Sequence, residues 1–213
     1  MRLLVVGGPR SGKTSWCREY IDGLRKRGCG VGGVLSLPIE KQGQRIGFNV
    51  TDLLTGKDTP FARLSPLKRF RGGESVGDYA ISRRGISFAR GAIERAIENR
   101  CDWVVIDEVG PLELDGKGLM PAVESALASP ANVLIVVRTS LEEALQRRFP
   151  QYKFVVIADL AGSRPNVSEL ADRKAHPPLG GSDAAVGVSG DLAVSKTAVV
   201  FQQESGSQVR VKL

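Results

Sequence analysis

Residues 7–14 read Gly7-Gly8-Pro9-Arg10-Ser11-Gly12-Lys13-Thr14. This run follows the apolar residues 3–6 and opens a helical pattern, which is the strand–loop–helix context of a phosphate-binding P-loop. Its glycines allow a tight backbone turn, so that successive N–H groups converge on phosphate oxygens at a helix N-terminus. Lys13 is expected to contact the β- and γ-phosphates of a nucleotide, and the Thr14 hydroxyl is expected to ligate Mg²⁺. The residues expected to bind the nucleotide are Gly7, Gly8, Pro9, Arg10, Ser11, Gly12, Lys13, Thr14 and Ser15.

The composition indicates an ordinary globular protein of one domain, with or without an appendage, because 213 residues carry 42% hydrophobic and 25% charged side chains. No apolar run approaches the roughly 20 residues that span a bilayer. Residues 2–6 lead into the P-loop without a signal-peptide pattern. We therefore expect a cytoplasmic protein with no membrane partner.

The cysteines and the histidine exclude two kinds of chemistry. Cys17, Cys29 and Cys101 are widely separated, and no pair has the spacing of zinc ligands or of a disulfide framework. The only histidine, His176, precedes two prolines in a segment expected to be a loop. A structural zinc site and a histidine general base are therefore not expected.

The net charge of +7 and the pI near 9.6 suit polyanionic ligands, which are either nucleotides alone or a nucleic acid. Basic clusters occur at residues 25–27, 68–71 and 83–84, but no aromatic side chains are interleaved with them over a long stretch. An exposed helix end or loop explains each cluster equally well. A nucleic-acid partner is therefore not favoured.

Hydrophobic patterning predicts strands that alternate with helices, which is typical of a mostly parallel sheet covered by helices on both faces. The apolar runs 103–106 and 132–137 have the character of central strands that are buried on both faces. Helices are predicted over residues 16–24, 88–97, 121–128 and 141–149. Further strands are predicted over residues 31–37, which Pro38 closes, and over residues 45–52, 79–82 and 154–157.

Two segments are expected to be irregular. Residues 56–75 are rich in Gly, Pro and basic side chains and are predicted to be a loop with at most one short strand. From residue 176 onward Gly, Ser and Pro become frequent, so the chain divides into a domain at 1–175 and an extension at 176–213. That extension is either a flexible segment or a short hairpin formed by residues 198–202 and 209–213.

Asp107 and Glu108 follow the apolar run 103–106 and supply the second half of a nucleotide site. A strand that ends in an acid delivers a carboxylate to the edge of a parallel sheet where ligands bind, so Asp107 is expected beside Mg²⁺ as a Walker B residue. A second carboxylate, Glu108, can polarise an attacking water. Lys13 and Glu108 are thus the candidate catalytic residues, and Thr14 and Asp107 are the candidate metal ligands.

The continuation Asp107-Glu108-Val109-Gly110-Pro111-Leu112-Glu113 resembles the acidic signature of the thermophile-type nucleoside-triphosphatases, which are also called cancer-related nucleoside-triphosphatases. The segments Arg45-Ile46-Gly47-Phe48 with Asp52-Leu53, and Val76-Gly77-Asp78-Tyr79, resemble the same family in the same order. The resemblance covers residues 1 to about 175 and implies a three-layer P-loop NTPase fold related to RecA-type and AAA-type ATPases. It also implies Mg²⁺-dependent hydrolysis of nucleoside 5′-triphosphates (ATP, GTP, CTP and UTP) to diphosphates, with broad tolerance of the base.

Three further residues have roles that the resemblance does not assign. Glu113 carries over as a motif residue without a mechanism. The side chain of Arg10 is expected to point into solvent. Arg138 follows the apolar run 132–137 and could reach the γ-phosphate, although a surface role explains it equally well.

Two other functions remain open on the sequence. The same phosphate-binding machinery makes a nucleotide or nucleoside phosphotransferase if a hydroxyl acceptor replaces water. A nucleotide-dependent RNA- or DNA-binding module could use the basic clusters, with hydrolysis as its timer. The oligomeric state is not fixed by the sequence, with a monomer slightly favoured.

Overall fold

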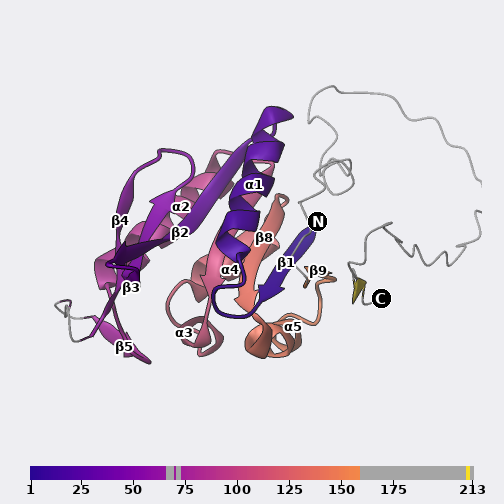
Figure 1. The fold of residues 1–213 in the computed structure, drawn as a ribbon. Helices are drawn as coiled ribbons and strands as arrows, with labels where there is room; N and C mark the ends of the chain where they lie inside the picture. The colour runs from indigo at the N-terminus through magenta and orange to yellow at the C-terminus, as the bar shows by residue number, and fades with distance from the viewer. Residues whose placement is uncertain (66–69, 71–72, 159–209, 212–213) are drawn as a thin grey trace, which may run out of the picture.

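The computed structural model describes residues 1–65, 70, 73–158 and 210–211, which form one mixed β-sheet with helices on both of its faces (Figure 1). In this part of the chain the ten strands lie in the order β10-β9-β1-β8-β7-β2-β3-β4-β6-β5. The strands are β1 (Arg2–Gly7), β2 (Val31–Lys41), β3 (Gln44–Asp52), β4 (Asp58–Leu64), β5 (Glu74–Val76), β6 (Tyr79–Ile81), β7 (Trp103–Val109), β8 (Asn132–Arg138), β9 (Val155–Ile157) and β10 (Arg210–Val211). The helices are α1 (Lys13–Lys26), α2 (Arg83–Glu98), α3 (Pro111–Leu114), α4 (Met120–Ala128), the 3-10 turn η1 (Thr139–Leu141) and α5 (Glu142–Arg148).

One half of the sheet is parallel and runs through β9, β1, β8, β7 and β2. Strand β8 pairs with both β1 and β7, so one strand separates the P-loop strand from the strand that carries the acidic pair. The register places Gly7 opposite Arg138. The carboxyl ends of β1, β8 and β7 therefore meet at one edge of the sheet, where parallel α/β proteins bind their ligands.

The two faces of the sheet are covered by different helices, as alternation along a strand requires. Leu3 and Val5 of β1 pack under α1, where Trp16 stacks on Tyr20 with ring centroids 5.1 Å apart. Leu4 and Val6 point to the opposite face, which α2, α4 and α5 cover. The predicted three-layer α/β architecture is confirmed.

Small residues bring α2 close to the sheet. Ala89, Ala92 and Ala96 are fully buried, and a Cβ added to Gly32 of β2 would lie 2.6 Å from the Cβ of Ala96. Ser82 is the N-cap of α2, because its side chain accepts a hydrogen bond from the N–H of Gly85 at 3.1 Å.

The other half of the sheet is antiparallel and differs from the prediction in two places. Strand β2 does not close at Pro38 but continues to Lys41, with Pro38 opposite Phe48. Its pairing with β7 ends at Val34, so the distal part of β2 has a neighbour on one side and tolerates a residue without an N–H. Residues 58–64, in a segment predicted to be a loop with at most one short strand, form the seven-residue strand β4. Its Pro60 lies beside a register shift in β3 and outside the pairing with β6.

Most other predicted elements are confirmed with shifted ends. The helix expected at 141–149 is divided into η1 and α5. Residues 210–211 are in a strand, but it pairs antiparallel with β9. Its expected partner at 198–202 lies outside the described residues, as does the boundary at residues 175 and 176. Among the described helices, none has both the length and the apolar character needed to cross a bilayer.

The buried carboxylate of Asp52 connects β3 to α2. It accepts hydrogen bonds from Arg95 (2.9 Å), from the N–H of Leu54 (2.9 Å) and from the Thr55 hydroxyl (2.9 Å). Burial alone would raise the pKa of Asp52, but these hydrogen bonds outweigh burial and hold the pKa below its usual value. The ionised carboxylate therefore stabilises the fold above the unfolded-state pKa, and this stabilisation is lost as the pH falls through the folded-state pKa.

The substitution Asp52→Asn is expected to lower the free energy of unfolding by about 1–3 kcal/mol at pH 7, because an amide donor would face the donors of Arg95 and Thr55. The difference from wild type should shrink as the pH falls below about 4. Urea denaturation at several pH values measures both effects.

The control is Glu143→Gln, which removes one partner of an exposed i,i+4 ion pair with Arg147. It should change the free energy of unfolding by less than about 0.5 kcal/mol. Equal losses in the two variants would contradict the role given to Asp52.

Candidate active site

The P-loop has the tight turn that its sequence predicts. Gly12 adopts φ +86°, a conformation that residues with a side chain rarely take, and α1 begins directly after it. A Cβ added to Gly7 would lie 2.4 Å from the Ser11 Oγ, so the loop closes on itself at that point. The Lys13 Nζ donates hydrogen bonds to the carbonyl oxygens of Gly7 (2.8 Å) and Gly8 (2.6 Å). Burial lowers the pKa of Lys13, while the nearby Glu108 and Asp107 carboxylates oppose that shift.

Asp107 is buried where three elements meet. Its Oδ2 accepts a hydrogen bond from the N–H of Ser36 on β2 at 2.9 Å and lies 3.4 Å from the donating hydroxyl of Thr14 on α1. Its Oδ1 is buried and has no hydrogen-bond partner among the described residues. Burial, with a contribution from the neighbouring Glu108 charge, raises the pKa of Asp107 to about 7.

The unpartnered Oδ1 of Asp107 and the adjacent Thr14 hydroxyl fit the chemistry of Mg²⁺, a hard cation that uses oxygen ligands. Within the described residues, no group of three or more His, Cys, Asp or Glu side chains could hold a metal ion by itself. Mg²⁺ commonly takes one or two protein ligands and completes its shell with phosphate oxygens and waters, so this limited set of protein donors is sufficient.

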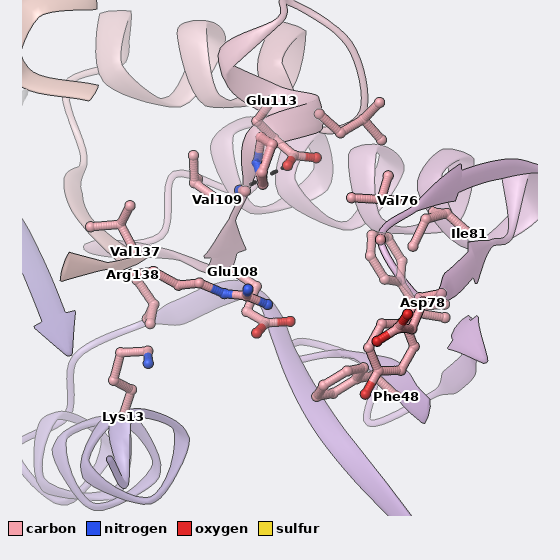
Figure 2. Close-up of a pocket in the computed structure, with 18 residues that line it drawn as sticks. Lys13, Phe48, Val76, Asp78, Ile81, Glu108, Val109, Glu113, Val137 and Arg138 are labelled. Carbon is pink, nitrogen blue, oxygen red and sulfur yellow. Dashed lines mark hydrogen bonds between the residues drawn. The ribbon is translucent and has the colours of Figure 1, made fainter. Parts of the chain in front are cut away.

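Glu108 lies in a strained part of β7. It has φ +69°, and the register with β8 shifts between Ile106 and Val109, which is a β-bulge. The sequence predicted that this strand ends with the acidic pair, and β7 continues one residue further, to Val109. The bulge leaves the Asp107 carboxylate buried and turns the half-exposed Glu108 toward the cleft beside Lys13 and Arg138 (Figure 2).

Glu113 holds the loop that follows Glu108. Its Oε2 accepts a hydrogen bond from the N–H of Gly110 at 2.9 Å (Figure 2), and its Oε1 accepts one from the N–H of Leu119 at 3.0 Å. The carboxylate is buried, which raises the pKa of Glu113, and a Cβ at Gly118 would lie 2.1 Å from Oε1. Glu113 therefore fixes the chain on the C-terminal side of the strained residue.

The positioning role of Glu113 also has a local signal in the sequence. A proline at the first position of a helix, followed by Glu at the third, is a pattern of helix starts in which the Glu reaches back to a backbone N–H. Pro111 and Glu113 fit that pattern, with Gly110 as the capped residue.

Two adjoining cavities lie at the edge of the sheet where β7 carries Asp107 and Glu108. The larger has a volume of about 650 Å³ and is lined by the P-loop from Pro9 to Ser15 together with Asp107. The smaller, of about 340 Å³, extends past Val109 into the antiparallel half of the sheet. Both cavities are lined by Lys13, Phe48, Tyr79, Glu108 and Arg138.

Four arginines line the larger cavity, and none of them forms an ion pair within the described residues. Arg10 is exposed, and Arg138 is the exposed last residue of β8, opposite the first glycine of the P-loop. The Nε of Arg45 is buried without a hydrogen-bond partner among the described residues, and its guanidinium lies 5.3 Å from the centre of the Phe48 ring. These arginines are Arg10, Arg18, Arg45 and Arg138.

Three features define the class of a P-loop nucleoside-triphosphatase. They are the P-loop after β1, the buried Asp107 on β7, which is two strands away from β1, and the helices that cover the parallel half of the sheet. The chain belongs to the NTPase family, whose model matches residues 2–167. Nucleoside-triphosphatase THEP1 of Methanosarcina acetivorans is 34% identical over 182 residues, which cover 84% of this chain and 99% of that protein. The enzyme of the same name from Methanopyrus kandleri is 33% identical over 181 residues, covering 80% of this chain and 91% of that one.

Two solved structures share the fold. A human cancer-related nucleoside triphosphatase superposes with a TM-score of 0.62 at 24% identity, covering 80% of this chain and 97% of that chain. THEP1 from Aquifex aeolicus gives a TM-score of 0.58 at 21% identity, covering 80% and 96%. These structures show the shared fold, while the family model and the curated relatives confirm the family expected from the acidic signature and identify the chain as an NTPase.

The substitution Glu113→Gln is expected to lower kcat for ATP hydrolysis by about 10- to 100-fold, because an amide would present a donor to one of the two N–H groups and release the loop beside Glu108. The KM for ATP should stay within about threefold, since the P-loop is unchanged. Steady-state kinetics separate the two parameters.

Glu124→Gln serves as the control, because the Glu124 carboxylate on α4 is half exposed and pairs with Arg148 away from the cleft. It should leave kcat unchanged. A Glu113→Gln enzyme that melts earlier but keeps the wild-type kcat would show that Glu113 acts on stability alone.

Proposed function

We propose that the protein hydrolyses nucleoside 5′-triphosphates to diphosphate and phosphate in a Mg²⁺-dependent reaction that accepts ATP, GTP, CTP and UTP. The observation that carries the proposal is the placement of Glu108 in the same cleft as Lys13 and the buried Asp107. A carboxylate at that place can orient and deprotonate a water, which nucleotide binding alone does not need.

Each residue of the site has a separate role in the proposed hydrolysis. Backbone N–H groups of the P-loop and the Lys13 ammonium bind the β- and γ-phosphates, and Glu108 accepts a proton from the attacking water. Thr14 and Asp107 would hold Mg²⁺, which when bound neutralises charge on the phosphate oxygens. Arg138, which lines the cleft beside Glu108, would stabilise the charge that develops on the γ-phosphate.

Broad tolerance of the base is consistent with the residues that line the larger cavity. The P-loop and the cleft arginines offer donors and positive charge, which recognise phosphates rather than bases. That a nucleic-acid partner is not favoured stays a prediction from the sequence; in the structure, Arg25 of the 25–27 cluster donates a hydrogen bond to the Leu53 carbonyl. A monomeric state and a cytoplasmic location remain predictions from the sequence.

Replacing Glu108 by Gln should reduce phosphate release from all four nucleoside triphosphates by about 10²–10⁴-fold, because the general base is lost while the phosphate site remains. Nucleotide binding, measured by calorimetry, should be retained. Release by the wild type should require Mg²⁺ and stop in a chelator.

The matched control is Glu40→Gln, a carboxylate that lines the same cleft from β2 but does not adjoin Asp107. Its phosphate release should stay within about threefold of wild type. If the Glu108→Gln enzyme released phosphate at the wild-type rate, another group would be the base.

Arg138→Ala is expected to reduce kcat by about 10²-fold with little change in KM, because the arginine would act on charge that develops in the transition state. The comparison variant is Arg10→Ala: this side chain lines the same cleft but is expected to point into solvent, so its kcat should stay near the wild-type value. Steady-state kinetics of both variants provide the test. Unchanged turnover in Arg138→Ala would assign that residue to the surface.

A further inference from the structure

The smaller cavity extends from Glu108 away from the P-loop, and several of the residues that line it have no task in hydrolysis (Figure 2). Phe48 of β3, Val76 of β5 and Tyr79 of β6 form one wall, and Leu112 of α3 lies in the other. These residues belong to the segments Arg45–Phe48, Val76–Tyr79 and Asp107–Glu113, which stand out in the sequence beyond the P-loop. The fold brings all three segments to one chamber.

The chamber has the chemistry of a small-molecule site. Its volume of about 340 Å³ is near the lower end of the roughly 300–1,000 Å³ range of ligand pockets, and its walls are mainly apolar and aromatic. The rings of Phe48 and Tyr79 have centroids 5.6 Å apart at an interplanar angle of 52° and offer faces to a planar ring. A pocket of this size admits a nucleoside but not a folded polymer.

Charge is distributed unevenly along the chamber. Among the described residues that line it, the cations Lys13 and Arg138 lie at the end shared with the phosphate cleft. At the other end lies Asp78, whose carboxylate makes no hydrogen bond or ion pair among the described residues (Figure 2). A free carboxylate of this kind can accept hydrogen bonds from the amines or hydroxyls of a ligand. The distal end therefore favours a neutral ligand with donor groups and disfavours an anion such as a nucleoside monophosphate.

We propose that this chamber binds a neutral nucleoside, which accepts the γ-phosphoryl group in place of water. A ligand seated there presents a hydroxyl toward Glu108 and Lys13, which line both cavities. The hydroxyl oxygen forms a bond to the γ-phosphorus, the bond from that phosphorus to the β-phosphate oxygen breaks, and Glu108 accepts the hydroxyl proton. The products are a nucleoside diphosphate and a nucleoside monophosphate. The inference rests on the proposed function, because it uses the same phosphate site and the same base.

The test follows ADP and inorganic phosphate separately when the full-length protein is given ATP and Mg²⁺ with adenosine, guanosine, cytidine or uridine. Hydrolysis alone gives one phosphate per ADP. Transfer lowers that ratio below one for at least one nucleoside, and radiolabelled γ-phosphate appears in the corresponding monophosphate.

Two substitutions place the transfer in the chamber. Val76→Trp fills it and should reduce monophosphate formation by at least about tenfold while phosphate release without nucleoside stays within about twofold. The matched control is Ser75→Trp, an exposed neighbour on β5 that does not line the chamber and should leave both reactions unchanged. Asp78→Asn alters charge without bulk and should raise the KM for the nucleoside several-fold.

Each outcome separates the two proposals. A phosphate-to-ADP ratio of one with every nucleoside, with hydrolysis intact, would overturn the acceptor site and leave the proposed function standing. Absence of ADP under all conditions would overturn both. Equal loss of transfer in Val76→Trp and Ser75→Trp, or faster transfer to nucleoside monophosphates than to nucleosides, would also overturn the site as described.

Discussion

The Asp107 carboxylate is the point on which the architecture of the site depends. It lies on β7, receives the N–H of Ser36 from β2 and lies against the Thr14 hydroxyl at the start of α1. A carboxylate removed from water is stable as an anion only where donors or a cation face it, so the three elements must keep this arrangement. The parallel pairing of β2 with β7 and the position of α1 above the sheet meet that requirement.

Two neighbouring acids in one strand take different roles because their surroundings differ. The bulge after Ile106 buries one carboxylate and turns the other toward solvent at a positive φ. Such a backbone conformation is unfavourable for a residue with a side chain and persists where the surrounding structure fixes it. The hydrogen bonds from Gly110 and Leu119 to Glu113 supply that support one turn further along the chain.

The parts of the site that follow from local chemistry could be predicted from the sequence. The P-loop turn, the strand before it and the buried runs of β7 and β8 depend on residues close together in the chain, and the structure has them where the pattern placed them. The three-layer order follows from alternating strands and helices. Asp107 and Glu108 can be recognised as a pair because the apolar run 103–106 directly precedes them.

The parts that depend on distant pairing could not be predicted. Pro38 and Pro60 are ordinary strand breakers, and they are tolerated because β2 loses its β7 neighbour and β4 has a register shift at that point. The two hydrogen bonds of Glu113 depend on where α4 begins relative to β7. The second chamber is formed by segments that are far apart in sequence, so no spacing rule indicated it. One strand, β2, belongs to both halves of the sheet, pairing with β7 up to Val34 and with β3 to Lys41. Within the sheet, the phosphate site and the antiparallel half are therefore joined through β2. Substitutions in the antiparallel half can change which second ligand is bound while the phosphate site stays the same.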